Sequence, residues 1–200
     1  MKICLRYLSE PGYQQGIGQE LGVSQATVSR TVDRVVNSIV AQSNEWIKFT
    51  TTNHELMEAK RIWQSMYKFP ATIGVIDCTY IEILKPNRHG DEYIDRKEMF
   101  TSVDVSWPGS VHDSRTWRNS QTRSQLINKA NVELLGADGY GIEPCLMTPV
   151  RNPTPGAEIN YNKLLKQERV IIERCFGQLK RRFPMKMKET MRMTNFLSAN

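Results

Sequence analysis

Apolar residues recur at intervals of three, four and seven positions near the start of the chain, which is the spacing of one face of an α-helix. The repeating positions are Ile17, Leu21, Val28, Val32, Val35, Val36 and Ile39. The pattern breaks at "LGVS", where Gly22 can adopt the positive φ that ends a helix and Ser24 can cap the next one. The sequence therefore predicts two amphipathic helices joined by a short turn.

This arrangement has the outline of a helix-turn-helix unit. The second helix is expected to begin at Ser24 and to present short polar and basic side chains that suit base edges and phosphates in a major groove: Gln25, Thr27, Ser29 and Arg30. Helix pairs joined by a glycine turn are also common in proteins that never bind DNA. The pattern alone leaves both interpretations open.

A further helix is predicted over "ELMEAKRIWQSMYKFP", ending at Pro70, with Thr52 or Asn53 as its cap. Beyond it the pattern changes. The segments "TIGVIDCTYIEIL", "SVDVSW" and "VELLGADGY" read as strands, and a long helix is expected from about Leu164 to Phe183. We therefore expect a helical, helix-turn-helix-like segment at 1–50, a linker and helix at 51–70, and an α/β or α+β domain at 71–200.

Charge and composition add a mild preference for an anionic partner. The chain has 27 Lys and Arg against 21 Asp and Glu, a formal net charge of +6, which favours association with a polyanion such as nucleic acid. The four cysteines are scattered without metal-ligand spacing, so neither a zinc site nor a disulfide framework is indicated. No apolar run approaches the roughly 18 residues of a membrane helix, and we expect a soluble intracellular protein.

Three carboxylates occupy positions that suit a metal site. Asp77 lies within an apolar strand, Asp138 ends the "ELLGAD" segment, and Glu173 lies on the closing helix. An unpaired buried carboxylate is costly, and hard oxygen ligands of this kind suit Mg²⁺ or Mn²⁺ in phosphodiester cleavage. The alternative is that Glu173 pairs with Arg169 on the surface and that the two aspartates merely end strands.

The closing helix has an apolar stripe and a basic end. Glu173, Gly177 and Lys180 lie beside the stripe on an adjoining face. A glycine inside a helix costs about 0.5–1 kcal/mol relative to alanine, so Gly177 predicts that a ligand or a packing neighbour approaches closely there. Lys180, Arg181 and Arg182 form a basic patch suited to DNA phosphates.

Several motifs in fixed order resemble the PIF/Harbinger transposase-derived DDE nuclease family. They are "GVIDCTYIEI", "RK" at Arg96 and Lys97, "WPGSVHDSRTWRNS", "LLGADGY", "LMTP" and "INYNKLLKQERVIIERCFGQLKRRF", and together they cover residues 69–183. The resemblance implies an RNase H-like fold, a mixed sheet with flanking helices, whose carboxylates bind a divalent metal and cut DNA. It matches the first family aspartate to Asp77 and the family glutamate to Glu173. It also implies nuclear or cytoplasmic localisation and a Myb-like partner protein.

The chain departs from the family pattern in four places. The second family aspartate falls on Ala137, and the nearest acid is Asp138. A regular strand would turn the Asp138 side chain to the other face, whereas a bulge or loop would restore its direction. Tyr80 replaces a histidine. The sequence between "RK" and "WPGS" is short, which predicts a shortened or lost central hairpin, and a polar C-terminal segment replaces a further apolar helix.

His112 and Asp113 in "SVHDS" allow two interpretations: a pair behind the metal site, or, as we favour, Asp113 as the cap of the next helix. The leading hypothesis is a transposase-derived, divalent-metal-dependent endonuclease that hydrolyses DNA, with Asp77, Asp138 and Glu173 as catalytic metal ligands. The alternatives are a catalytically lapsed relative that binds DNA or a protein, and a degenerate transposon copy without a stable fold.

Overall fold

The computed structural model describes residues 1–9, 13–49, 52–83, 94–95, 99–108, 110–182 and 189–198. Arg96, Lys97 and Phe183, and the side chain of Tyr80, lie outside what it describes. The helices are α1 Lys2–Ser9, α2 Gln14–Leu21, α3 Gln25–Ala41, α4 Ser43–Trp46, α5 Asn53–Met66, α6 Asp113–Arg118, α7 Gln121–Leu126 and α8 Ala157–Arg182. The strands are β1 Thr72–Ile83, β2 Ile94–Asp95, β3 Met99–Phe100, β4 Ser102–Pro108, β5 Glu133–Leu135, β6 Leu146–Met147 and β7 Glu189–Ser198.

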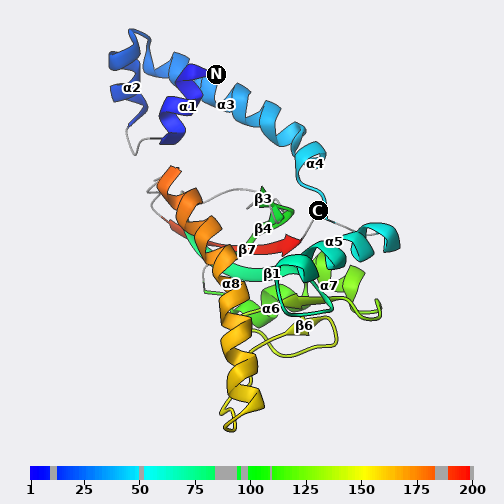
Figure 1. Ribbon diagram of the computed structural model, residues 1–200. Helices are drawn as coiled ribbons and strands as arrows, with labels where there is room; N and C mark the ends of the chain where they lie inside the picture. Colours follow the sequence, from blue (N-terminus) through cyan, green and yellow to red (C-terminus); the bar gives the residue numbers. More distant parts are fainter. Residues whose placement is uncertain are drawn as a thin grey trace.

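The first three helices pack on one another and form a small core of their own. Ile17, Val28 and Val32 are buried there, and half-buried side chains from all three helices surround them. The turn between α2 and α3 is as the sequence predicts: Gly22 has a φ of 67°, and the Ser24 hydroxyl accepts a hydrogen bond from the Thr27 amide. The α1 helix was not predicted separately. Figure 1 shows this three-helix unit set apart from the sheet, with α3 and α4 leading down to α5.

The α5 helix begins at a capping box. The Thr52 side chain accepts from the Glu55 amide, and the Glu55 carboxylate accepts from the Thr52 amide, which satisfies two backbone donors that the helix start leaves open. The cap is therefore Thr52 rather than Asn53. The helix ends at Met66, before the predicted stop at Pro70, and Tyr67 stacks on Trp63 with ring centroids 4.6 Å apart.

The strands of the described residues form one mixed sheet. Its order is β3-β2-β7-β1-β5-β6, and β4 pairs with β7. β1 pairs in parallel with β5 and antiparallel with β7, and β5 pairs in parallel with β6. The predicted strands at β1 and β4 are confirmed, whereas only residues 133–135 of "VELLGADGY" are strand. The mixed α/β class is thus confirmed, and the RNase H-like assignment stays a prediction.

The C-terminal segment occupies the centre of the sheet. β7 pairs with β1 from Gly74↔Ser198 to Ile83↔Glu189, and its other edge pairs with β4 and β2. A short hairpin of β2 and β3, which pair at Ile94↔Phe100 and Asp95↔Met99, lies at the edge of the sheet. The expectation of a shortened or lost central hairpin between "RK" and "WPGS" stays a prediction. The polar segment that replaces the family's apolar helix therefore provides the antiparallel neighbour of β1 (Figure 1).

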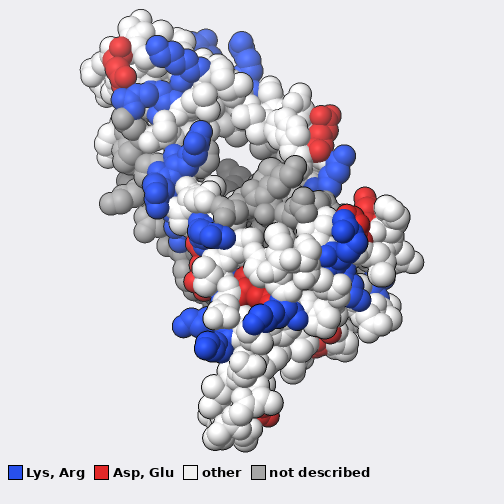
Figure 2. Space-filling model, viewed as in Figure 1, with Lys and Arg blue, Asp and Glu red and all other residues white. Residues whose placement is uncertain are grey.

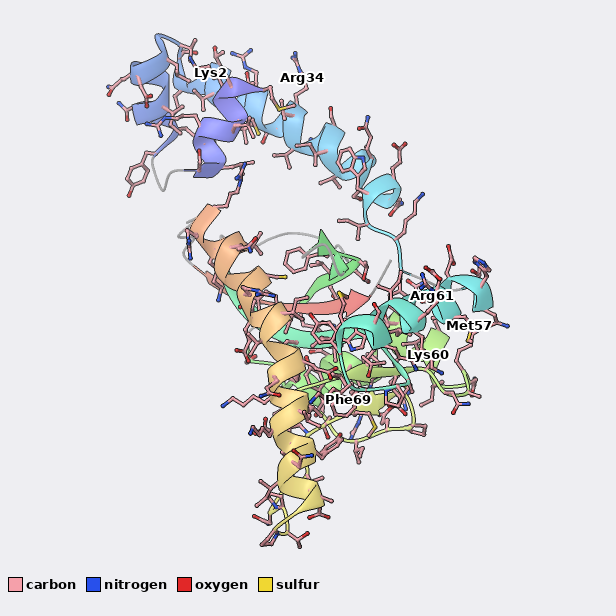
Figure 3. The ribbon with its side chains drawn as sticks, in the orientation of Figure 1. Lys2, Arg34, Met57, Lys60, Arg61 and Phe69 are labelled. Carbon is pink, nitrogen blue, oxygen red and sulfur yellow. The ribbon has the colours of Figure 1, made fainter. Side chains whose placement is uncertain are left out.

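The α8 helix lies across β1 and joins the sheet to α5. It begins at Ala157, earlier than predicted, because the loop before it ends at Gly156 with a φ of 104°. Ile172 and Phe176 bury their side chains in the main core with Ile73, Val75 and Ile76 of β1. Phe69 packs edge-on against Tyr161 of α8 (Figure 3), with ring centroids 5.5 Å apart. The proposed division at 50 and 70 stays a prediction, although the two cores are separate.

Candidate active site

Asp77 is the central residue of the site, and both of its carboxylate oxygens are engaged. Oδ1 accepts a hydrogen bond of 3.0 Å from the Cys78 amide, and Oδ2 accepts one of 2.9 Å from Nη2 of Arg169. The Asp77 side chain is 17% exposed, since it lies within the apolar strand β1 and beneath α8. The sequence predicted that this carboxylate would be exposed, paired with a cation or bound to a metal, and the structure shows the ion pair.

The ion-pair partner of Asp77 is Arg169, which the sequence had suggested as a partner of Glu173. The alternative interpretation paired it with Glu173 on the surface, but its side chain is only 10% exposed and contacts Asp77. It follows Glu168, which is 4% exposed and accepts hydrogen bonds from Trp63 Nε1 at 3.0 Å and the Lys68 amide at 2.7 Å. Helical spacing was the available signal, because Glu168 and Arg169 lie three and four residues after Leu165 and share the buried face of α8 with it and with Ile172.

Glu173 lies one helical turn after Arg169, on the same side of α8, and its side chain is exposed. Burial raises the pKa of Asp77 above its ordinary value, and the negative charges of Asp113 and Glu173 add to that rise. The Arg169 guanidinium and the Cys78 amide lower the same pKa but do not offset burial. Asp77 and Glu173, the two carboxylates that match family motifs, therefore act on each other electrostatically.

Asp138 is placed differently from the other two carboxylates. It is exposed in the turn after β5, where its backbone carbonyl accepts a hydrogen bond of 3.3 Å from Nη2 of Arg151. Ala137, at the position of the family aspartate, is half-buried and packs against the main core. The charges that shift the pKa of Asp77 come from Arg169, Asp113 and Glu173. A metal-binding role for Asp138 stays a prediction.

Asp113 is the carboxylate that sequence reasoning placed in a different role. The expectation that it caps the following helix was wrong by one residue: His112 is the cap of α6, accepting from the Ser114 amide through Nδ1, and Asp113 is the first helical residue. A side chain added at Gly139 would meet Asp113 Oδ2 at 2.5 Å. The Asp113 carboxylate thus lies against the turn that contains Asp138 and within electrostatic reach of Asp77.

Tyr140 and Cys78 complete the buried side of the site. The Tyr140 hydroxyl and the Cys78 sulfur are 3.0 Å apart, and Tyr140 is 2% exposed. Burial, with smaller contributions from Cys78, Asp77 and Asp113, raises the pKa of Tyr140 well above its ordinary value. The phenol is therefore neutral, and its contact with the Cys78 thiol, in which either group can donate, ties the turn after β5 to β1.

The donor chemistry fits a hard divalent cation, but the present spacing is not that of a formed metal site. Carboxylate oxygens are the ligands that Mg²⁺ and Mn²⁺ prefer, and the charges of Asp113 and Glu173 both raise the pKa of Asp77. Among the described residues, however, no three His, Cys, Asp or Glu side chains gather closely enough to hold a metal ion. Asp77 and Glu173 are the residues that would hold such an ion.

The outer face of α8 is basic. Figure 2 shows Lys and Arg side chains gathered along α8 and over the N-terminal helices on one face of the molecule. The predicted phosphate-binding residues Lys180, Arg181 and Arg182 are all exposed at the end of α8. Among the described residues, the predicted packing neighbour at Gly177 is absent, since none of their atoms beyond the helix's own backbone lies within 4 Å of the place where its Cβ would be. The other predicted reason for a glycine at this position, the close approach of a ligand, stays a prediction.

The predicted base-contacting residues of α3 differ in how available they are. Gln25 and Arg30 are exposed, and Thr27 and Ser29 are half-buried. The Thr27 hydroxyl lies 2.9 Å from that of Ser24, within the helix cap. The labelled Arg34 of α3 points away from the sheet in Figure 3. DNA binding by these residues stays a prediction.

Two further findings concern other parts of the molecule. Met57, Lys60 and Arg61 line an open hollow on the outer face of α5 together with His54, Glu58 and Gln64 (Figure 3). Within the described part of the chain, no helix combines the length and the apolar character needed to span a bilayer.

Comparison with known proteins agrees with the motif resemblance. The chain is 29% identical over 196 residues to "Putative nuclease HARBI1" of Bos taurus and 27% identical to the Homo sapiens protein of that name, and each alignment covers 90% of this chain and 56% of the relative. It is 23% identical over 213 residues to "Protein ALP1-like" of Arabidopsis thaliana, covering 52% of that protein. The chain thus spans about half the length of the curated relatives it matches. No solved structure matches.

The predicted resemblance to HARBI1-like, transposase-derived nucleases is confirmed by these relatives and by a family match. The family described as "DDE superfamily endonuclease" matches residues 76–195, more than half of the chain. That range begins one residue before Asp77 and includes Glu173 and most of β7. The chain belongs to the DDE superfamily endonuclease family.

Proposed function

We propose that this chain is the catalytic part of a transposase-derived endonuclease that hydrolyses DNA phosphodiester bonds with the help of Mg²⁺ or Mn²⁺. The observation that carries the proposal is the 2.9 Å contact of Asp77 on β1 with Arg169 on α8, one helical turn before Glu173, which brings together the two elements that carry the matched carboxylates within the family's range. A divalent ion bound there would activate water and stabilise the leaving oxygen.

The protein's own residues would provide the frame for this chemistry. β1 fixes Asp77 beneath α8, and the Cys78 amide orients one of its oxygens. Glu173 faces solvent from the next turn of α8 after Arg169, where a DNA backbone can reach it. Two residues are candidates for the third carboxylate. Asp138 is the acid next to the family position at Ala137, and Asp113 is an acid whose charge acts on Asp77. Each therefore requires its own test.

DNA would be held by the basic face. Lys180, Arg181 and Arg182 continue from Glu173 along the same helix, which suits contacts to phosphates rather than bases. The α2–α3 unit would add contacts through Gln25 and Arg30, with Thr27 and Ser29 beside them. A nuclease acting on chromosomal DNA would work in the nucleus, and a Myb-like partner protein would help bring it to its target.

Cleavage of supercoiled plasmid by the purified chain tests this proposal. We expect nicked product with Mn²⁺ or Mg²⁺ and none with excess EDTA. The Glu173→Gln variant should lose the activity, while Glu158→Gln should keep it, because Glu158 lies at the other end of α8 and its carboxylate accepts hydrogen bonds from Thr154. Metal-independent nicking, or equal nicking by both variants, would contradict the proposal.

A second function, a lapsed relative that binds DNA without cutting it, is favoured by one observation. Ala137 occupies the family position of an aspartate and packs against the core. If the natural chain retards DNA in a gel but does not cut it, and Ala137→Asp restores metal-dependent nicking, the natural protein is a binding protein that has lost its third carboxylate.

A further inference from the structure

We propose that Arg169 is a built-in cation that competes with a divalent metal for Asp77 and thereby sets how much metal the site requires. The inference rests on the proposed function, since it assumes that Asp77 is a metal ligand. It concerns a residue of α8 that takes part in neither the carboxylate set nor the exposed basic patch.

The contact itself is close and sheltered. Nη2 of Arg169 lies 2.9 Å from Oδ2 of Asp77, and the two side chains are 10% and 17% exposed. Charge-assisted hydrogen bonds of this kind are stronger than neutral ones, and shelter from water strengthens the attraction further. A cation therefore already occupies the oxygen of Asp77 that is not oriented by the Cys78 amide.

The position of Arg169 makes simultaneous occupancy unfavourable. Arg169 and Glu173 are four residues apart on one helix, so their side chains leave α8 on the same side. An ion between Asp77 and Glu173 would then lie beside the guanidinium, and like charges at short range in a sheltered site repel strongly. Binding a divalent ion must break or loosen the Arg169 contact.

Arg169 has a physical reason to remain where it is in the absence of metal. Without it, Asp77 would be a mostly buried carboxylate near Asp113 and Glu173 and without a cationic partner, which is strongly unfavourable. The Nε atom of Arg169 is itself buried and has no hydrogen-bond partner in the described structure. The hydrogen bond to Asp77 is thus the contact through which the described structure holds this guanidinium.

The test is the affinity for Mn²⁺, measured as free Mn²⁺ by electron paramagnetic resonance during titration of the purified chain. Arg169→Gln should bind Mn²⁺ more tightly than the natural chain by about 5- to 150-fold, the usual range for coupling between two binding events. Arg123→Gln is the matched control, because it breaks another partly buried ion pair, with Glu143 at 2.7 Å, away from Asp77. It should leave the affinity unchanged.

Two further variants define the site. Arg169→Lys keeps the positive charge and should keep the weak Mn²⁺ binding of the natural chain, which a purely structural role for the arginine would not predict. Adding Asp77→Asn to Arg169→Gln should abolish the tight binding.

A measurement on the natural chain covers the case in which Arg169→Gln does not fold. The Arg169 Nε–H resonance, assigned by its absence from Arg169→Lys, should shift on addition of Mg²⁺ as the guanidinium leaves Asp77. An unshifted resonance at saturating Mg²⁺ would overturn the inference.

The outcomes separate the inference from the proposed function. Equal, Asp77-dependent Mn²⁺ binding by the natural chain and Arg169→Gln would overturn the competition while leaving the metal-dependent nuclease intact. Failure of both to bind Mn²⁺ would overturn the competition and also the metal dependence of the proposed function. Tighter binding by Arg169→Gln alone would support both.

Discussion

The three-helix unit and the sheet domain are stabilised in different ways. The unit of α1, α2 and α3 depends on a small apolar core and on contacts between residues close in sequence, such as the Ser24 cap and the turn at Gly22. The sheet domain depends on partners far apart in the chain: Asp77 with Arg169, Trp63 with Glu168, and β1 with β7. A change in the first region should act locally, whereas a change in the second should affect the whole domain.

Removal of β7 should give the largest effect. Deleting residues 189–198 leaves β1 without its antiparallel neighbour and β4 without a partner strand, which exposes unpaired backbone groups at new sheet edges. We expect the cooperative unfolding of the sheet domain to be lost, measured by circular dichroism during urea titration, while helical signal from the N-terminal unit persists. An unchanged urea midpoint would show that β7 contributes nothing to the sheet.

Substitution of Glu168 should come next. Glu168→Leu leaves the Trp63 indole and the Lys68 amide without their acceptor in a buried place, and we expect a loss of about 3 kcal/mol or more in the free energy of unfolding. Glu58→Gln is the control, since its pair with Arg61 is exposed and such pairs contribute little. Equal urea midpoints for the two variants would mean that the buried bonds of Glu168 are not stabilising.

Two glycines of α2 should respond in opposite directions. A Cβ at Gly18 would meet the Val23 carbonyl oxygen at 2.6 Å, whereas nothing lies within 4 Å of one at Gly16. Gly18→Ala should lower stability by about 1–3 kcal/mol through overpacking, and Gly16→Ala should raise it by about 0.5–1 kcal/mol. The midpoint of thermal unfolding, followed by the helical circular dichroism signal, measures the effect of each variant. Equal midpoints for the two variants would contradict the close approach of Gly18 to the Val23 carbonyl.

The smallest effect is expected at Gly177. Because its added Cβ meets no protein atom, Gly177→Ala should raise the free energy of unfolding by about 0.5–1 kcal/mol. If a DNA backbone approaches α8 there, the same variant should bind DNA more weakly in a gel-shift titration. An unchanged DNA affinity would mean that DNA does not approach α8 closely at Gly177.

The sequence predicted the local features of this fold well. Helix periodicity, the Gly22 turn and the Ser24 cap identified α2 and α3, and the β-branched run identified β1, because these signals lie within a few residues. The role of residues 189–198 could not be predicted, since this polar, methionine-rich segment joins the sheet through pairing with β1, β2 and β4, which are distant in sequence. The start of α8 was missed because the signal for it is the loop glycine Gly156.

The sequence predicted which residues belong to the site better than it predicted the contacts that they make. Asp77 was recognised as needing a partner, but nothing near it in sequence indicates Arg169, which is 92 residues away. The cap of α6 was assigned to Asp113 from its position before "SRTWRNS", whereas the His112 ring accepts the hydrogen bond. The position of Asp113 near Asp77 depends on the packing of α6 against the sheet, which no local pattern encodes.

Plasmid nicking by four matched carboxamide variants tests the central claim, that Asp77 and Glu173 are the catalytic carboxylates, most directly. Asp77→Asn, Glu173→Gln, Asp113→Asn and Asp138→Asn are compared with the natural chain at saturating Mn²⁺, each after its unfolding midpoint has been measured. We expect Asp77→Asn and Glu173→Gln to lose nicking by at least about a hundredfold, the lower end of the usual loss of a catalytic group. Between the other two, the greater loss identifies the third carboxylate. Full activity in folded Asp77→Asn would contradict the account.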